Sequence, residues 1–212
     1  MKVVSILSQK GGVGKTTTAI NLAVAAEADN KTTAVFDLDP QATASFWKDI
    51  REKDTPAVVS IQAVRLEAML KSAKEAGTDI VFIDGAAVAR DIAYLAAAVS
   101  DYILIPTRTA VFDTMSMTHT MSIAKEQGIP FTVLLNFVPP AGQETRDAER
   151  MVESMGAEIC PIKIGNRKSY FRAQSTGLAV QEYEPDGKAA IEIKRLYKFI
   201  CMSVYSNEEV TA

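Results

Sequence analysis

Apolar residues along the chain gather in short runs, and each run is followed by a stretch with helical spacing of its apolar residues. The runs predict strands at residues 2–8, 32–39, 57–61, 79–85, 101–106, 130–137 and 157–164. The stretches predict helices at residues 15–28, 42–51, 64–76, 92–99, 113–127, 144–155, about 169–176 and 188–204. Runs such as VFID and ILIP are apolar at consecutive positions, which is typical of strands buried between two helical layers. The alternation predicts an α/β fold with one doubly wound, mostly parallel sheet and helices on both faces.

The domain organisation follows from the same pattern. No composition break and no low-complexity linker divides the 212 residues, so we expect one domain over residues 1–212, with residues 206–212 as a flexible tail. Ligands of doubly wound sheets bind at the carboxyl ends of the strands. The functional residues are therefore expected in the loops that follow the strands.

Composition narrows the function classes. The formal net charge of −3 excludes a polycation, so any contact with nucleic acid must come from a local patch. Cys160 and Cys201 stand far apart and form no CxxC pair, which favours a reducing cytoplasm over a disulfide framework. No apolar run approaches the roughly 20 residues of a membrane-spanning helix. With a single histidine, a structural zinc site is not expected.

The segment QKGGVGKTTT at residues 9–18 is predicted to bind phosphate, because it follows a strand and opens a helix. Its glycines permit a tight path whose N–H groups point at phosphate oxygens, and the helix N-terminus adds a partial positive charge. Lys15 is expected to neutralise the β- and γ-phosphates, and the Thr16 hydroxyl to ligate Mg²⁺. A glycine-rich turn with an incidental lysine is the alternative. The predicted nucleotide-binding residues of this loop are Gly11, Gly12, Val13, Gly14, Lys15, Thr16 and Thr17.

The loop departs from the ordinary pattern GxxxxGK[ST], which begins with glycine. This chain has Gln9 there and an additional lysine, Lys10, before the paired glycines. KGGVGKTT resembles the deviant Walker A motif of the ParA/MinD family of ATPases. The resemblance covers nearly the whole chain and is strongest to short ParA-type plasmid partition proteins. In that family the extra lysine reaches the nucleotide of the other subunit, which implies that ATP drives formation of a homodimer. Lys15 would then serve its own subunit's ATP, and Lys10 that of the second subunit.

Three aspartates follow strands. Asp37 and Asp39 in FDLDPQ lie on the same side by strand alternation, and Asp84 ends DIVFIDG. FDLDPQ resembles the family's DxDPQ box, which implies that Asp39 positions the attacking water. Asp37 is expected to assist the Mg²⁺ shell, and Asp84 to hold Mg²⁺ through water as the Walker B acid. Helix capping by Asp39 and a simple turn at Asp84 are the alternatives.

Two further segments resemble the family. Asn136 ends the strand at 130–137, and similar proteins hydrogen-bond adenine there; a turn asparagine is the alternative. The segment IPTRTAVFDTMS at residues 105–116 resembles a stretch that contributes to the dimer surface. Within it, Asp113 is expected to be a helix N-cap.

A basic patch is predicted from residues 159–181, which contain no acidic residue. Arg167, Lys168 and Arg172, with two aromatic residues among them, are expected to bind DNA without sequence specificity. Similar ParA proteins place DNA-contacting residues in this part of the chain. A solvated basic helix face is the alternative, and Arg167 is also a candidate dimer contact.

Together these features predict a cytoplasmic, nucleoid-associated, Mg²⁺-dependent ATPase that forms an ATP-bound homodimer and partitions plasmid DNA. Its partner would be a centromere-binding or adaptor protein of the ParB-like or ribbon–helix–helix type. The alternative is a positioning ATPase for another cargo, either conjugation-associated or a protein cluster.

Other functions are less expected. A Min-type membrane ATPase needs an amphipathic anchor, but residues 188–200 suit packing on the core and SNEEVTA is acidic, so no stable membrane anchor is expected. The two cysteines do not match a bridging cluster of an electron-transfer ATPase. Gln9 and Lys10 argue against a small-molecule kinase.

Overall fold

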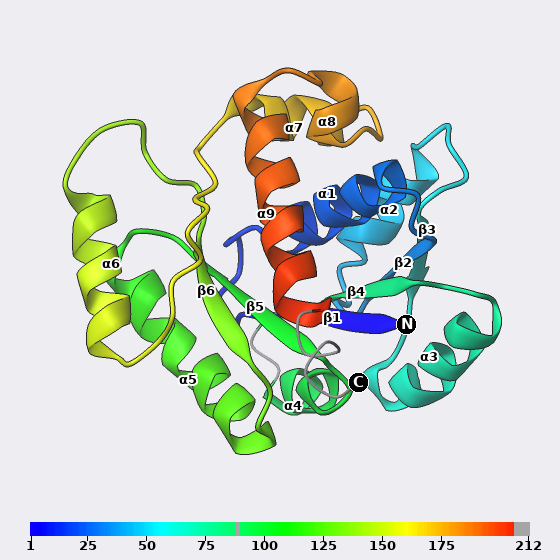
Figure 1. Ribbon diagram of the computed structural model, residues 1–212, viewed down its shortest axis with the longest axis horizontal. Helices are drawn as coiled ribbons and strands as arrows, with labels where there is room; N and C mark the ends of the chain where they lie inside the picture. The colour runs from blue at the N-terminus through cyan, green and yellow to red at the C-terminus, as the bar shows by residue number, and fades with distance from the viewer. Residues whose placement is uncertain (88–89, 206–212) are drawn as a thin grey trace.

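The computed structural model describes residues 1–87 and 90–205, so the tail expected at residues 206–212 lies outside the described part. The strands of that part form one sheet, in which every neighbouring pair is parallel (Figure 1). The order is β3-β2-β4-β1-β5-β6. The strands are β1 (Lys2–Ile6), β2 (Thr33–Asp37), β3 (Ala57–Ser60), β4 (Ile80–Asp84), β5 (Tyr102–Thr107) and β6 (Phe131–Leu135). The predicted parallel sheet is confirmed.

Helices cover both faces of this sheet (Figure 1). They are α1 (Lys15–Ala28), α2 (Thr43–Asp49), α3 (Leu66–Glu75), α4 (Arg90–Ala98), α5 (Val111–Gln127), α6 (Glu144–Ser154), α7 (Lys168–Gln174), α8 (Val180–Tyr183) and α9 (Lys188–Tyr205). A short 3₁₀ helix, η1 (Ala63–Arg65), precedes α3. The sequence did not predict α8, because four residues are too few to display a helical period.

Alternate strand residues feed two separate apolar clusters, one on each face of the sheet. In β4, Ile80 and Phe82 pack with α1 and α9, whereas Val81 and Ile83 pack with the layer of α3 to α6. All four side chains are at most 1% exposed. Burial on both faces explains why the strand is apolar at every one of these positions, as the sequence indicated.

α9 packs against the first of these layers. Its residues Ile193, Leu196 and Ile200 are at most 1% exposed, which confirms the predicted docking of this helix on the core. Within residues 1–87 and 90–205, no helix is both long and apolar enough to cross a membrane.

The segment at residues 157–164, which was predicted to be a strand, is not one. It touches β6 through an isolated bridge between Val133 and Ile159, and the Cys160 N–H donates to the Val133 carbonyl at 2.8 Å. Pro161 follows, and it has no N–H and a fixed φ. A continuous ladder therefore cannot form at this edge of the sheet.

The strand register gathers the predicted site residues at the carboxyl edge of the sheet. Ile6, the last residue of β1, pairs with Asp84, and Asp84 also pairs with Asp37 at the end of β2. The chain leaves β1 directly into the phosphate loop and α1. The two aspartates and this loop therefore meet where the fold class places its ligands.

Candidate functional site

The loop between β1 and α1 has the backbone conformation of a glycine-dependent anion cradle. Gly12 (φ 69°) and Gly14 (φ 89°) are both left-handed, and Gly14 is the N-cap of α1. A Cβ at Gly14 would collide with the side-chain nitrogen of Asn136. No side chain caps α1 and no acidic residue lies in its first turn. The first N–H groups of α1 are therefore left for a phosphate group.

Lys15 lies inside this cradle rather than in solvent. It is only 6% exposed, and its Nζ donates to the Lys10 carbonyl at 3.2 Å. Burial lowers the pKa of Lys15, while the negative charges of Asp84 and Asp39 act in the opposite direction. A buried ammonium beside two carboxylates is placed to neutralise phosphate charge.

Asp84 is the most unusual group of the site. It is fully buried, and no hydrogen bond of normal length and angle reaches either carboxylate oxygen from the described residues, although the Thr16 hydroxyl lies close to it. Burial raises the pKa of Asp84 to about 7, although the nearby Thr16 hydroxyl and the Lys15 ammonium partly oppose the rise. Two unpaired buried oxygens require a proton or a cation.

Mg²⁺ fits these oxygens and the hydroxyl of Thr16. Mg²⁺ prefers oxygen ligands, keeps several waters and is usually held by one or two protein groups together with substrate phosphates. No cluster of three or more His, Cys, Asp or Glu side chains suitable for a metal occurs in residues 1–87 and 90–205. Asp84 and Thr16 offer two protein groups, which is the number that usually holds Mg²⁺ together with substrate phosphates.

Asp37, which was predicted to assist the Mg²⁺ shell, is engaged by the backbone at the start of α2. Its carboxylate accepts the N–H groups of Asp39 at 3.0 Å, Ala44 at 3.1 Å and Ser45 at 3.3 Å. Burial raises its pKa, and these N–H groups oppose the rise. Asp37 therefore satisfies the first turn of α2, and its contribution to Mg²⁺ stays a prediction.

Asp39 remains the candidate for positioning water. It is half-buried, and one oxygen accepts the Gln41 N–H at 2.9 Å. The N-cap of α2 is Ala42, and Asp37 supplies the capping oxygen, so the capping alternative for Asp39 is wrong. Its role toward water stays a prediction.

Asn136 braces the phosphate loop. It is 2% exposed, its Nδ2 donates to the Val13 carbonyl at 2.9 Å, and its Oδ1 accepts the Phe137 N–H at 2.9 Å. The amide thus makes both a turn contact and a loop contact. Hydrogen bonding to adenine stays a prediction.

Lys10 lies at the rim of the site. Its Nζ is 3.3 Å from Asp113 Oδ1, and the Lys10 side chain is 45% exposed. Asp113 is not the N-cap that was predicted, because α5 begins at Val111 and its N-cap is Ala110. Inside the first helical turn, the carboxylate is instead free to pair with Lys10.

Sequence reasoning missed Arg108. It donates to the Gly12 carbonyl, and its guanidinium lies 5.1 Å from the centre of the Phe137 ring. An exposed loop arginine has no periodicity to mark it. The available signal was its position directly after β5, at the carboxyl edge of the sheet.

The first turn of α5 exposes apolar side chains beside Lys10. Val111 is 54% exposed, Phe112 80% and Met115 54%. Exposed apolar side chains clustered in one turn are typical of interaction surfaces. A dimer contact by this segment stays a prediction.

The three basic residues predicted to bind DNA differ in their contacts and exposure. Arg167 pairs with Glu192, which raises the pKa of the guanidinium. Lys168 and Arg172 are exposed and lie one turn apart on α7, with Phe171 beside them at 76% exposure. The accessible part of the patch is therefore Lys168, Phe171 and Arg172.

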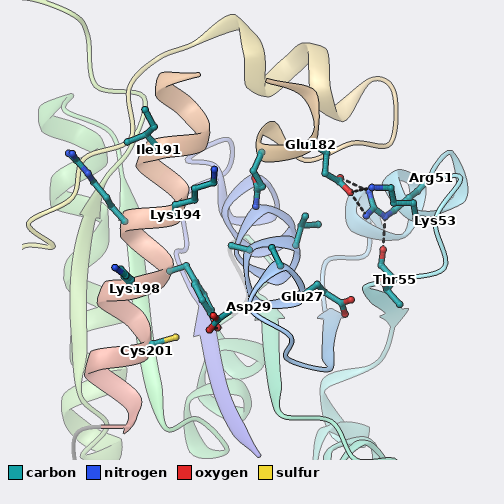
Figure 2. A pocket seen from close by; sticks show the side chains of 16 residues that line it. Glu27, Asp29, Arg51, Lys53, Thr55, Glu182, Ile191, Lys194, Lys198 and Cys201 are labelled. Carbon is teal, nitrogen blue, oxygen red and sulfur yellow. Dashed lines mark hydrogen bonds and ion pairs between the residues drawn. The ribbon is translucent and has the colours of Figure 1, made fainter. Parts of the chain in front are cut away.

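A separate groove of about 950 Å³ lies between the C-terminal half of α1, α9 and residues 51–55 (Figure 2). Arg51 and Lys53 face Glu182 at one end, and Lys194 and Lys198 line the α9 side. The groove contains none of the predicted nucleotide-binding residues. It is a concave region distinct from the phosphate loop.

Comparison with known proteins identifies the family. The model described as the CobQ/CobB/MinD/ParA nucleotide binding domain matches residues 4–180. The chain belongs to this family. The match begins in β1 and ends at the start of α8, so the family domain includes the phosphate loop and both strand-end aspartates. The predicted resemblance to ParA/MinD proteins is thereby confirmed.

Individual family members match over most of their length. The chain is 34% identical over 202 residues to the Maintenance of carboxysome distribution protein A of Gloeobacter kilaueensis, covering 93% of this chain and 91% of that protein. It is 27% identical over 180 residues to Protein ParA of Rhizobium radiobacter, covering 80% and 81%. A solved ATP complex of McdA from Cyanothece covers 96% of both chains with a TM-score of 0.78 at 18% identity, which shows the shared fold.

Proposed function

We propose that the chain is a Mg²⁺-dependent ATPase that forms a homodimer with ATP and positions a cargo over DNA. The observation that carries this proposal is the arrangement at the ends of β1 and β4. Lys15 is buried beside the unpaired carboxylate of Asp84, while Lys10 stands at the exposed rim. A phosphate-bearing ligand with a divalent cation satisfies the two buried groups, and the rim lysine is left for a second subunit.

Each residue of the site has a part in this proposal. Lys15 and the N–H groups at the start of α1 bind the phosphates, and Thr16 and Asp84 hold Mg²⁺. The bound Mg²⁺ would neutralise charge that develops on the phosphate oxygens. Asp39 orients the attacking water from the loop after β2. Hydrolysis by the isolated chain is then slow, because Lys10 completes the charge neutralisation only in the dimer.

Replacing Lys10 by alanine should leave ATP binding intact and abolish ATP-dependent dimers. Lys10 is at the rim and pairs with Asp113, so its removal leaves the buried Lys15 and Asp84 in place. Analytical ultracentrifugation with ATP and Mg²⁺ measures the dimer, and calorimetry measures binding. Asp39→Ala is the matched control, since it should still dimerise with ATP. Normal dimers of the Lys10 variant would refute the role in the second subunit.

The relatives favour a protein assembly as the cargo. The relative that aligns over 91% of its own length at 34% identity is named for carboxysome distribution, whereas the ParA relative is 27% identical over 81% of its length. We therefore place a protein-cluster cargo, with an adaptor partner, ahead of plasmid partition with a ParB-like partner. Tracking a labelled plasmid and a labelled protein cluster in cells that lack the protein distinguishes the two cargoes.

DNA binding by α7 is the second part of the proposal, and it would make the cytoplasmic protein nucleoid-associated. Changing Lys168 and Arg172 together to glutamate should abolish ATP-dependent binding to unrelated duplexes, because both side chains are exposed on one helix face. Wild-type affinity should fall steeply with salt, by a slope of about −0.9 per neutralised phosphate. Gel shifts with and without ATP measure both effects.

The matched control changes Lys71 and Lys74 to glutamate. Both are exposed on α3, which packs on the opposite face of the sheet from α7. The change in net charge is the same, because each variant replaces two basic residues by two glutamates. The control should keep DNA binding. Equal loss in both double variants would mean that net charge, not the α7 surface, governs binding.

A further inference from the structure

α7 is attached at its C-terminal end to the phosphate-loop helix. Gln174, its last residue, donates from Nε2 to the Thr17 hydroxyl at 3.1 Å. Thr17 is the third residue of α1 and directly follows Thr16. The helix that carries the exposed Lys168 and Arg172 is therefore tied by one side-chain contact to a predicted nucleotide-binding residue.

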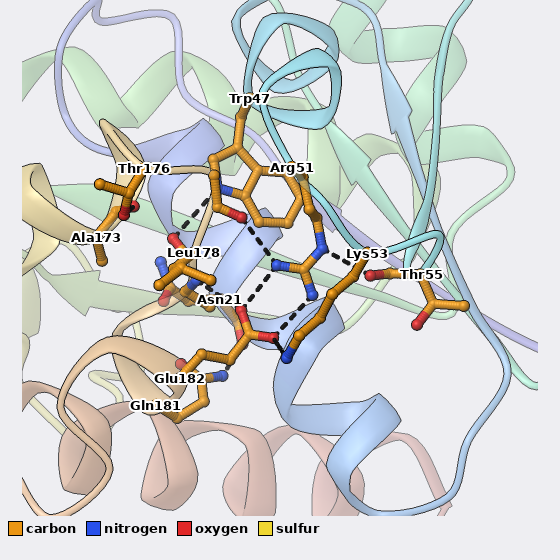
Figure 3. A network of polar contacts seen from close by, with 12 residues as sticks. Asn21, Trp47, Arg51, Lys53, Thr55, Ala173, Thr176, Leu178, Gln181 and Glu182 are labelled. Atoms are coloured by element: carbon orange, nitrogen blue, oxygen red, sulfur yellow. Dashed lines mark hydrogen bonds and ion pairs between the residues drawn. The ribbon is translucent and has the colours of Figure 1, made fainter.

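A second attachment joins the residues after α7 to α2. We call it the clasp: Trp47 and Arg51 on the α2 side, and Gly177, Leu178 and Glu182 on the other (Figure 3). The indole Nε1 donates to the Leu178 carbonyl at 3.2 Å, and Arg51 Nη1 donates to the Gly177 carbonyl at 2.9 Å. Arg51 also donates to both oxygens of Glu182, at 2.8 and 2.9 Å. A bidentate pair fixes orientation as well as distance.

The clasp is buried and its backbones touch. The Arg51 side chain is 2% exposed and lies 4.8 Å from the Trp47 ring centre. Gly177 has φ +67°, and a Cβ there would lie 2.7 Å from the Arg51 Cα and from the Ile50 carbonyl oxygen. No larger residue fits, so α2 and the segment after α7 have little freedom to move independently.

The other end of α2 is held by Asp37, the last residue of β2, which pairs in register with Asp84. Asp37 accepts the N–H groups of Ala44 and Ser45 in the first turn, and the N–H of Asp39. Between them Ala42 has φ 49°, a strained conformation for a residue with a Cβ. α2 is seven residues long, so a shift of its first turn moves the whole helix and with it the clasp.

We propose that the clasp transmits the nucleotide state of the phosphate loop to α7, with Arg51 as the positioning residue. The inference rests on the proposed function, because it requires ATP in the loop. α7 is held through Thr17 on α1, through the clasp on the α2 side, and through its Tyr170 hydroxyl, which donates to the Ala189 carbonyl of α9 at 3.4 Å. A change in the position of α2 relative to α1 therefore reorients α7 and the side chains of Lys168 and Arg172. An anionic partner such as DNA would meet a different surface with and without ATP.

A static brace is the competing explanation, and loss of stability does not separate the two. Burial alone would raise the pKa of Glu182, but hydrogen bonds from Arg51, the Ala179 N–H and Lys53 hold it at about 2. Removing one partner of such a hydrogen-bonded pair, with one side chain buried and the other 14% exposed, destabilises the fold whether or not the pair moves. The test therefore needs a readout that a brace would not change.

Hydrogen–deuterium exchange in the Lys10→Ala background supplies that readout, since this variant is expected to bind ATP without dimerising. Any effect of ATP on α7 in this variant then arises within one subunit and not from dimer contacts. We expect ATP with Mg²⁺ to slow exchange at residues 10–17 and also to change it at residues 168–178. With Glu182→Gln added, the change at 168–178 should be lost while that at 10–17 remains.

Lys53→Gln is the matched control. Lys53 also pairs with Glu182, at 2.7 Å, but its side chain is 58% exposed and it does not bond to Gly177. The Lys53→Gln variant should still show the ATP-dependent change in exchange at residues 168–178. Trp47→Phe removes the indole hydrogen bond and reduces the buried ring beside Arg51, so it should reduce the change at residues 168–178. This variant covers the case in which Glu182→Gln does not fold. A change at 168–178 that persists in folded Glu182→Gln would overturn the proposal.

Trp47 offers an independent measurement because it is the only tryptophan in the chain. In the same background, ATP with Mg²⁺ should alter its emission, and Glu182→Gln should remove the alteration. Absent protection at residues 10–17 would mean that the phosphate loop does not bind ATP, and the proposed function would fail. Protection there with unchanged exchange at 168–178 and unchanged Trp47 emission would overturn the clasp alone.

Discussion

Replacing Lys15 by alanine is expected to weaken ATP binding by at least about 30-fold, because truncating one partner of a buried charge pair costs roughly 2–5 kcal/mol. Lys15 is 6% exposed and its Nζ already lies against the loop, 3.2 Å from the Lys10 carbonyl. The ammonium therefore already lies at the loop that is predicted to bind phosphate. Calorimetric titration with ATP and Mg²⁺ measures the loss.

Lys10→Ala is the control for this measurement, since it removes the same kind of charge from the same loop. Lys10 is 45% exposed and pairs with Asp113, so its loss should leave the affinity for ATP within a few-fold of the wild type. If both variants bound ATP as tightly as the wild type, the assignment of residues 9–18 to phosphate binding would be wrong.

Contacts close in sequence explain which parts of this site were predictable. The phosphate loop is contiguous in sequence, so the spacing of Gly12, Gly14 and Lys15 makes it recognisable. The structure places all three residues in one loop. Asp84 is recognisable because four apolar residues lead to it at a strand end. Doubly wound topology then determines that these loops meet.

Contacts between distant residues were not predictable. Arg108 reaches Gly12 across 96 positions, and Arg51 reaches Glu182 across 131. Neither arginine lies in a motif, and nothing in the local pattern says which loop it will meet. Asp37 shows a subtler limit. β2 ends at Asp37, so strand alternation does not extend to Asp39, and the Asp37 oxygens accept N–H groups of α2 that only the turn at Ala42 brings within reach.

The unpaired carboxylate of Asp84 makes the ligand-free protein sensitive to pH. Its pKa of about 7 in the folded protein lies above its usual value of 3.8. The folded state therefore keeps a proton between about pH 4 and 7 that the unfolded chain has lost. While Asp84 is protonated at low pH, the free energy of unfolding is at its higher value. It decreases as the pH rises toward 7 and the buried carboxyl loses its proton. Above pH 7 the buried charge carries its full cost, on the order of 4 kcal/mol.

Asp84→Asn is therefore expected to stabilise the ligand-free protein at pH 8 by roughly 1–3 kcal/mol, because about 4 kcal/mol of charge burial is relieved and 1–3 kcal/mol is returned by the unpaired amide. The gain should shrink as the pH approaches 4. Asp37→Asn should have the opposite effect at pH 8. Its carboxylate accepts three N–H groups, and an amide nitrogen cannot replace an accepting oxygen.

If Asp84 is the ligand of Mg²⁺, adding Mg²⁺ with ATP should reverse the order of stability of the wild type and Asp84→Asn. Urea unfolding with ATP alone and with ATP plus Mg²⁺ measures the stabilisation that the cation adds. The wild type should gain stability from Mg²⁺, since the cation neutralises the buried carboxylate. Asp84→Asn should gain little, because an amide offers a weaker, uncharged ligand. If Asp84→Asn were less stable than the wild type at pH 8 without ligand, the Asp84 carboxylate would have a hydrogen-bond or ionic partner in solution. An undiminished gain from Mg²⁺ would place the cation elsewhere.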